Sequence, residues 1–294
     1  MKQANRRENL LNLLYILPML AVFAAFIIYP ITEVFNLSVY DRTSTGQYFY
    51  VGLNNFIKFI RHRETSRLLL NTGIWVFVGT FFKLLFGLGM ALVLYQAFPG
   101  KKVMTGIILI PYAMPAAVSC MIWRLMYNPV FGHIGDILTR LGLISEPLNF
   151  LGNTKTSLLA VMIVNVWAVA PFCALNILST LYSIPTYIYE AAKIDGAGSI
   201  QSFFKITLPL IASSMRTLGL LVGIWAFNSF DVIFMMTQGG PANSSSILVS
   251  NIYQNAFQFN NRPYSAAVSV VCFVILSIFA LLYVRSKEGD VSYE

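Results

Sequence analysis

The chain has 294 residues, of which 57% are hydrophobic and only 11% are charged, and its formal net charge is +8. A soluble domain carries about 25% charged residues, so this composition excludes a protein whose surface faces only water. Several apolar runs exceed the roughly 18 residues that cross a bilayer. We therefore predict an all-α, polytopic membrane protein, with membrane lipid but no nucleic acid among its partners.

Six membrane spans are predicted within a single domain covering 1–294. They lie at about 11–33, 70–97, 104–126, 157–181, 210–236 and 265–284. The first span follows Lys2, Arg6 and Arg7, as a signal peptide core would. Its apolar stretch is longer than a signal core of about 7–15 residues, so we expect a membrane helix.

An even number of spans places both termini on the same side of the membrane. Basic residues are almost equally numerous on the two sides, but the segments on the side of the termini are shorter and therefore more densely charged. By the positive-inside rule, this density predicts cytoplasmic termini.

Cysteine and histidine give no sign of a metal site. Cys120, Cys173 and Cys272 all lie inside apolar runs, whereas His62 and His133 stand alone in polar stretches. An odd cysteine count without paired spacing argues against a disulfide framework or a zinc site. We expect the cysteines to serve as packing residues.

The segment between the fourth and fifth spans, 183–209, is polar and interrupted by glycine. Ser183 is placed to cap a helix that has Pro185 in its first turn. Gly196 is placed to end that helix in the left-handed conformation. A second short helix is predicted over 199–207, with Ile200, Phe203 and Phe204 on one face. Pro209 would mark the entry to the fifth span.

Two interpretations of this segment compete. It is either a linker whose amphipathic helix lies on the membrane surface, or a helix that docks into a groove of a soluble partner. Physical chemistry alone does not separate them.

The segment resembles the EAA loop of bacterial ABC importer permeases. The matching positions are Glu190, Ala191, Ala192, Asp195, Gly196, Ala197, Ile206 and Pro209. Ser213 stands where that family often has a second proline. The resemblance implies that this loop, with Phe203 and Phe204, is held in a cleft of a separate ATPase subunit and couples ATPase closure to the membrane helices.

A second stretch, 230–257, resembles carbohydrate-uptake permeases of the MalF-like type. The likeness is carried by Thr237, Gly239, Gly240, Pro241, Tyr253, Ala256 and Phe257. Gly-Gly-Pro is a turn signal that ends the fifth span, and a short external helix is expected to follow it.

The resemblance implies a set of partners in the bacterial cytoplasmic membrane. They are a second, different permease, ATP-binding cassette subunits that carry ATP and Mg, an external solute-binding protein and a sugar substrate. The stretch 98–104 contains Gly-Lys but lacks the rest of a phosphate-binding loop. This chain is therefore expected to be no enzyme and to bind no cofactor itself.

Two other functional classes remain as alternatives. An ion-coupled secondary transporter would need titratable residues near the midplane and paired repeats. An integral membrane enzyme would need clustered acids or histidines, and none is visible in the sequence.

Polar residues within apolar runs should face the bundle interior or a wet cavity. Trp225, Asn228 and Asp231 recur at spacings that place them on one side of a helix, and sugars bind to amides, carboxylates and aromatic rings. The substrate-pathway residues predicted on this basis are Trp225, Asn228, Ser229, Asp231, Asn165, Trp167, Lys83 and Tyr112. Alternatively, these side chains hold neighbouring helices together.

Lys83 lies near the middle of the second span, where an ammonium costs roughly 2.5–3.5 kcal/mol. It either meets a substrate hydroxyl or carboxylate or binds neighbouring helices. A carboxylated sugar would suit Lys83 and the basic stretch 58–67, which could equally face lipid headgroups or the binding protein. A substrate of the glycerol-phosphate type stays open as well.

Overall fold

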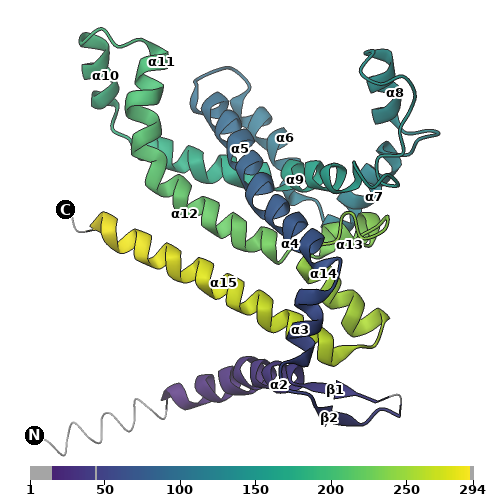
Figure 1. Ribbon diagram of the computed structural model, residues 1–294. Coiled ribbons are helices and arrows are strands. Elements are labelled where there is room, and N and C mark those ends of the chain that lie inside the picture. Colours follow the sequence, from purple (N-terminus) through teal and green to yellow (C-terminus); the bar gives the residue numbers. More distant parts are fainter. Residues whose placement is uncertain (1–14, 44, 292–294) are drawn as a thin grey trace, which may run out of the picture. The chain divides into compact units, whose positions relative to one another are not determined.

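Helices dominate the architecture of this chain, as Figure 1 shows. The computed structural model describes residues 15–43 and 45–291, with side chains up to residue 281. The chain divides into two compact units, Met1–Thr65 together with Ile252–Glu294, and Ser66–Asn251. The prediction of an all-α membrane protein is confirmed.

In the described part of the chain, five helices are long and apolar enough to cross a bilayer. They cover Tyr15–Ser38, Thr65–Tyr95, Ser157–Ser183, Ser199–Phe227 and Arg262–Leu281. They correspond to the first, second, fourth, fifth and sixth predicted spans. Residues 11–14 of the first predicted span lie outside the described residues.

The third predicted span is not one helix. It consists of α6 (Lys101–Ala113) and α7 (Ala116–Met126), which are bent by 94° relative to each other. Pro115 disfavours helical geometry at the residue before it, and Met114 is extended, with φ −77° and ψ 137°. The bent pair covers the predicted span at about 104–126 but breaks it at a bend that the sequence analysis did not predict, and the described residues contain six spans if this pair is one span.

The fifth span is broken at its far end. α12 (Leu208–Phe227) stops at Asn228, and α13 (Asp231–Thr237) begins after a short interruption. A single helix over 210–236 was therefore a wrong prediction, as was a common helix face for Trp225, Asn228 and Asp231. The turn after Thr237 ends α13 as predicted.

The second helix predicted within 199–207 is not separate from this span. α11 (Ser199–Ser202) continues through a π-helical segment, Phe203–Thr207, into α12. Pro209 lacks the N–H that an i→i−4 bond needs, and the π-helical segment stands directly before it. Pro209 therefore lies within the long helix and does not begin it.

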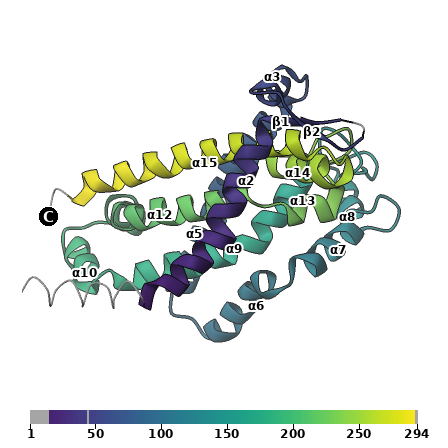
Figure 2. The ribbon, with the colours of Figure 1, turned by 90° about the horizontal axis from the view of Figure 1, so that it is seen from below.

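The core of unit 66–251 forms where three helices meet, α5 (Gly79–Tyr95), α9 (Ser157–Ser183) and α12. A Cβ at Gly87 would lie only 2.6 Å from the Cβ of Cys173, so glycine permits the close approach of α5 and α9. Around this contact the buried residues include Ala91, Leu94, Ile177, Leu181, Ile211 and Val222. Figures 1 and 2 show α5 crossing α9 in both views.

Beyond α13, the same unit is held together by buried polar side chains. The Asn71 amide donates to the carbonyl oxygens of Ser244 and Ser246, each at 3.0 Å. The hydroxyls of Ser157 and Ser244 lie 2.7 Å apart. These bonds tie the loop after α13 to α4 (Thr65–Gly73) and α9. The short helix expected after this loop is present as α14 (Leu248–Tyr253), and its continuation, Gln254–Gln258, is π-helical.

The other unit contains α2 (Tyr29–Ser38), a hairpin of β1 (Tyr40–Arg42) and β2 (Tyr48–Tyr50), α3 (Asn54–Arg61) and α15 (Arg262–Val291). Its first span, Tyr15–Ser38, contains a π-helical segment at Ala24–Ile28 directly before α2. The Asn55 amide donates to the carbonyl oxygens of Ser38 and Tyr40 at 3.1 and 2.6 Å, which fixes α3 against the hairpin. Neither the hairpin nor α3 was predicted from the sequence.

Lys58, from the basic stretch 58–67, forms an ion pair with Asp41 at 2.7 Å. Partial burial acts to raise the pKa of the Asp41 carboxyl, but the Lys58 hydrogen bond, the Arg42 amide and the Lys58 charge together hold that pKa below its ordinary value. At least one member of the basic stretch is therefore engaged within the protein.

Candidate functional site

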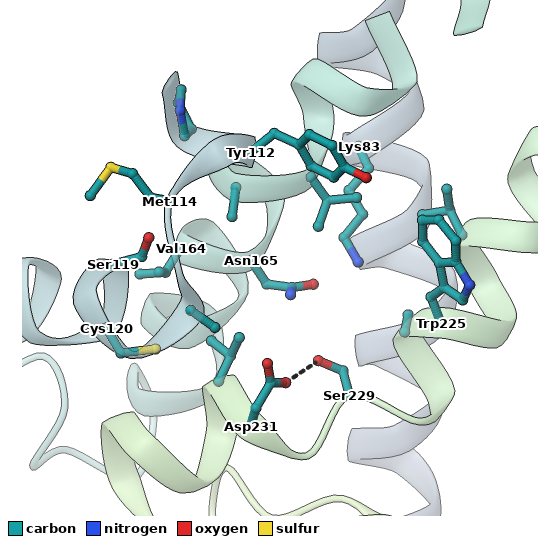
Figure 3. A pocket seen from close by; sticks show the side chains of 17 residues that line it. Lys83, Tyr112, Met114, Ser119, Cys120, Val164, Asn165, Trp225, Ser229 and Asp231 are labelled. Carbon is teal, nitrogen blue, oxygen red and sulfur yellow. Dashed lines mark hydrogen bonds between the residues drawn. The ribbon is translucent and has the colours of Figure 1, made fainter. Parts of the chain in front are cut away.

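A cavity of about 250 Å³ lies among α5, α6, α7, α9, α12 and α13. Its lining combines apolar residues with a set of polar and aromatic side chains. That set comprises Lys83, Tyr112, Ser119, Asn165, Trp225, Ser229 and Asp231. Figure 3 shows them converging from several elements on a shared space.

Two helix breaks create this cavity. Met114 and Ala116 line it beside the break between α6 and α7, and Ser229 and Asp231 line it beside the break between α12 and α13. Non-helical backbone at membrane depth is tolerated where it lines a cavity. The breaks that the sequence analysis missed are thus the features that open the site.

The cavity brings together six of the eight predicted substrate-pathway residues. Those that line it are Lys83, Tyr112, Asn165, Trp225, Ser229 and Asp231. Asn228 and Trp167 are not among its lining residues. Because α12 ends at Asn228, its amide turns back onto its own helix and donates to the Ile224 carbonyl at 3.0 Å. Trp167 lines a separate apolar cavity and packs edge-on against Trp123, with ring centroids 5.5 Å apart.

Sequence reasoning missed Ser119 and Cys120, which also line the cavity. Both follow Pro115 by little more than one helical turn. Recognising the break at Pro115 would have pointed to them.

An aromatic wall borders the cavity. The Trp225 and Phe172 ring centroids lie 5.0 Å apart, and those of Phe172 and Tyr112 lie 5.3 Å apart. Aromatic faces give a sugar ring an apolar surface, and nearby amides and carboxylates pair with its hydroxyls. The arrangement can therefore bind a polyhydroxylated solute.

The second candidate region is the loop 183–209, which joins α9 to the helix containing α12. Ser183 is the last residue of α9, and its hydroxyl donates to the Thr180 carbonyl at 2.7 Å. The prediction that it caps the next helix was wrong, because that helix, α10 (Thr186–Ile194), begins after Pro185.

The end of α10 has the predicted left-handed glycine. Gly196 has φ +81°, and the Ala197 amide donates to the Ala192 carbonyl at 2.9 Å while the Gly196 amide donates to that of Lys193 at 3.2 Å. This pair of bonds is a Schellman motif, which favours glycine at this position. A Cβ on Gly196 would meet no atom within 4 Å.

Large apolar side chains are exposed on this loop. Ile194 is 86% exposed, Ile200 77% and Phe204 61%. The two arms of the loop are joined by a 3.0 Å hydrogen bond between the Tyr189 and Thr207 hydroxyls. Within unit 66–251, α10 lies at the opposite end from α13 in both ribbon views (Figures 1 and 2).

Comparison with known proteins assigns the chain to a family. Residues 83–287 match the family of binding-protein-dependent transport system inner membrane components. The chain is 35% identical to the trehalose/maltose transport system permease protein MalF of Thermococcus litoralis, over 95% of this chain and 94% of that protein. It is 31% identical to the sulfoquinovosyl glycerol transport system permease protein SmoG of Agrobacterium fabrum, over 95% and 90% of the two chains.

The fold has a counterpart among solved structures. A chain of a bacterial ABC transporter involved in the import of the acidic polysaccharide alginate aligns with a TM-score of 0.81, at 19% identity, over 96% of this chain and 98% of that one. Together with the apolar helices, these matches identify a multi-pass protein of the plasma membrane. The chain belongs to the family of binding-protein-dependent transport system inner membrane components, the permease subunits of ABC transporters.

Proposed function

We propose that this chain is one of two different permease subunits in an ATP-driven importer that carries a sugar across the cytoplasmic membrane by alternating access. The ATP and Mg would be held by separate ATP-binding cassette subunits, and an external binding protein would deliver the sugar. Both termini and the loop 183–209 would face the cytoplasm.

The observation that carries the proposal is the construction of the loop 183–209. Exposed Ile194, before the fifth span, and exposed Ile200 and Phe204, in the first two turns of the helix Ser199–Phe227, present an apolar surface that a partner's groove would cover. Gly196 fixes the turn between the two arms, and no described residue beyond its chain neighbours lies within 4 Å of a Cβ placed there. The second arm continues into α12 without interruption, so movement of a docked partner would be transmitted to the helix that carries Trp225.

The cavity supports the role of the membrane helices in transport. It lies where α5 and α9 meet two broken helices, and discontinuous helices at solute sites are a recurring feature of transporters. Rocking of α12 relative to α5 and α9 would expose this cavity alternately to the two sides. Trp225, Asn165 and Asp231 would contact the sugar during that exchange.

The names of the relatives favour a sugar or sugar derivative but do not fix its charge. One relative is named for trehalose and maltose, another for diacetylchitobiose, a third for sulfoquinovosyl glycerol and a fourth for sn-glycerol-3-phosphate. These relatives resemble this chain to nearly the same degree, and their names include both neutral and anionic solutes.

An ion-coupled transporter is the second candidate, since Lys83 and Asp231 are charged and both line the cavity. The test uses membrane vesicles that contain the complete transporter and an internal ATP-regenerating system, supplied with binding protein and a panel of labelled oligosaccharides. The proposal expects uptake that requires ATP and persists when an uncoupler collapses the ion gradients. Uptake that stops with the uncoupler while ATP stays high would favour ion coupling instead.

A further inference from the structure

Lys83 occupies a fixed position in the cavity wall. It is only 2% exposed, and it lies one helical turn before Gly87, where α5 touches α9 most closely. Residues four apart share a helix face, so the contact at Gly87 keeps Lys83 on the side of α5 that faces α9. Figure 3 shows its ammonium directed into the space beside Asn165 and Trp225.

Within the described part of the chain, the Lys83 ammonium has no acidic side chain at ion-pair distance. Its side chain also forms no hydrogen bond to any of the described residues. An ammonium offers three donors, and burying one unpaired is costly because little solvent remains to stabilise its charge. A solute that enters the cavity could supply the compensating group.

The opposite wall of the cavity has a different character. The Asp231 carboxylate accepts a long hydrogen bond of 3.5 Å from the Ser229 hydroxyl (Figure 3). Ser119 adds a buried hydroxyl oxygen that has no partner in the described part of the chain. A carboxylate and hydroxyls suit the hydroxyl groups of a sugar, whereas Asp231 would repel a second negative charge placed beside it.

We propose that the cavity selects a sugar or sugar-like solute with a single anionic group, a carboxylate, sulfonate or phosphate. The anion lies against Lys83, and the hydroxyl groups of the solute face Asp231 and Asn165. The inference rests on the proposed function and adds to it the charge of the substrate and its orientation. A neutral sugar offers Lys83 only dipoles, which stabilise a buried charge far less than an opposite charge does.

The test compares uptake of matched probes by vesicles that contain the complete transporter and its binding protein. The probes are cellobiose with cellobiouronic acid, and glycerol with glycerol 3-phosphate, so that each pair differs by a single anionic group. The binding protein also selects solutes. The informative quantity is therefore the change in uptake of each probe that a Lys83 variant causes relative to wild type. Lys83→Met should lower uptake of the anionic probe at least tenfold and that of its neutral partner less than twofold, and Lys83→Arg should retain most anionic uptake.

Several results would overturn the inference. These are uptake confined to neutral probes, no uptake of any anionic probe, and Lys83→Met affecting both members of a pair equally. In each case, uptake that requires ATP would leave the proposed function intact. Uptake that does not require ATP would reject the proposed function itself. If the Met variant fails to reach the membrane, Lys83→Gln, which keeps a donor without the charge, takes its place.

An internal ion pair is the remaining rival, since Lys83 and Asp231 could neutralise each other in another conformation. The double variant Lys83→Met with Asp231→Asn distinguishes the two. We expect it to transport the anionic probe no better than Lys83→Met alone. Recovery of anionic uptake in the double variant would assign Lys83 to an internal pair and reject the proposal.

Discussion

The loop 183–209 and the cavity beside Lys83 are opposite in chemistry. The loop exposes apolar side chains such as Ile194, before the fifth span, and Phe204, near the start of that span, whereas the cavity places polar groups such as Lys83 and Asn165 among membrane helices. Each is unfavourable without a partner: exposed apolar surface favours a protein groove, and polar groups at membrane depth favour a hydrogen-bonding solute. The contrast indicates two kinds of partner for one unit of the chain.

The largest expected effect comes from the framework that supports both regions. Gly87→Val places a branched side chain where even a Cβ would lie 2.6 Å from Cys173, and overpacking of this kind costs about 1–3 kcal/mol or more. We expect little folded permease in the membrane, with docking and uptake lost together. Gly89→Val is the matched control, because a Cβ there meets nothing within 4 Å. Equal thermal stability of the two variants in detergent would contradict the close contact of α5 and α9.

A second change should separate the regions. Asn165→Ala removes a cavity amide and should reduce uptake about tenfold, which corresponds to about 1.4 kcal/mol, without changing membrane abundance or ATPase association. Asn228→Ala is the control, since that amide is bonded to its own helix. Initial uptake rates at equal membrane abundance would measure the difference, and a larger loss for Asn228→Ala would refute the placement of the cavity.

A third change tests the polar anchor that ties α4 to the loop after α13, away from both regions. Asn71→Ala leaves two buried carbonyl acceptors without their donor, a loss of about 1–3 kcal/mol in the free energy of unfolding. Thermal unfolding of the purified protein measures it, with exposed Asn176→Ala as the control. Docking and uptake per folded molecule should stay normal in both variants. A defect in only one of these activities would show that the anchor serves one region more than the other.

The smallest expected effect lies within the loop. Tyr189→Phe and Thr207→Val each remove the hydroxyl bond between its two arms, which is worth about 0.5–1.5 kcal/mol. ATPase binding should weaken slightly and equally in the two variants, and the double variant should be no worse than either one. Additive losses in a binding assay would mean that the two hydroxyls act independently.

The two regions also differ in how far the sequence predicts them. The loop is contiguous, and its turn depends on one glycine whose positive φ has a recognisable local signal, so Gly196 was placed correctly. The cavity joins α5, α9 and the two broken helices, and its shape depends on where those helices break. Pro115 was visible but not used, and the break after Phe227 contains no proline or glycine.

Side-chain direction was harder still to predict. Asn228 has the right residue type and spacing for the cavity, yet the end of α12 turns its amide onto the Ile224 carbonyl. Ser183 has the right type for a helix cap, but α9 extends far enough to include it. In both cases the length of a neighbouring helix, which depends on tertiary packing, decided the outcome.

Copurification would show whether the loop 183–209 binds an ATPase. Tagged wild-type protein, Gly196→Trp and Gly142→Trp would be isolated from native membranes in mild detergent and their partners identified by mass spectrometry. Both glycines have positive φ and open space around them, so the two tryptophans cause comparable backbone strain at different sites. We expect a P-loop ATPase and a second permease to copurify with wild type and with Gly142→Trp, and the ATPase to be lost with Gly196→Trp alone. An ATPase retained by Gly196→Trp, or absent from wild type, would contradict it.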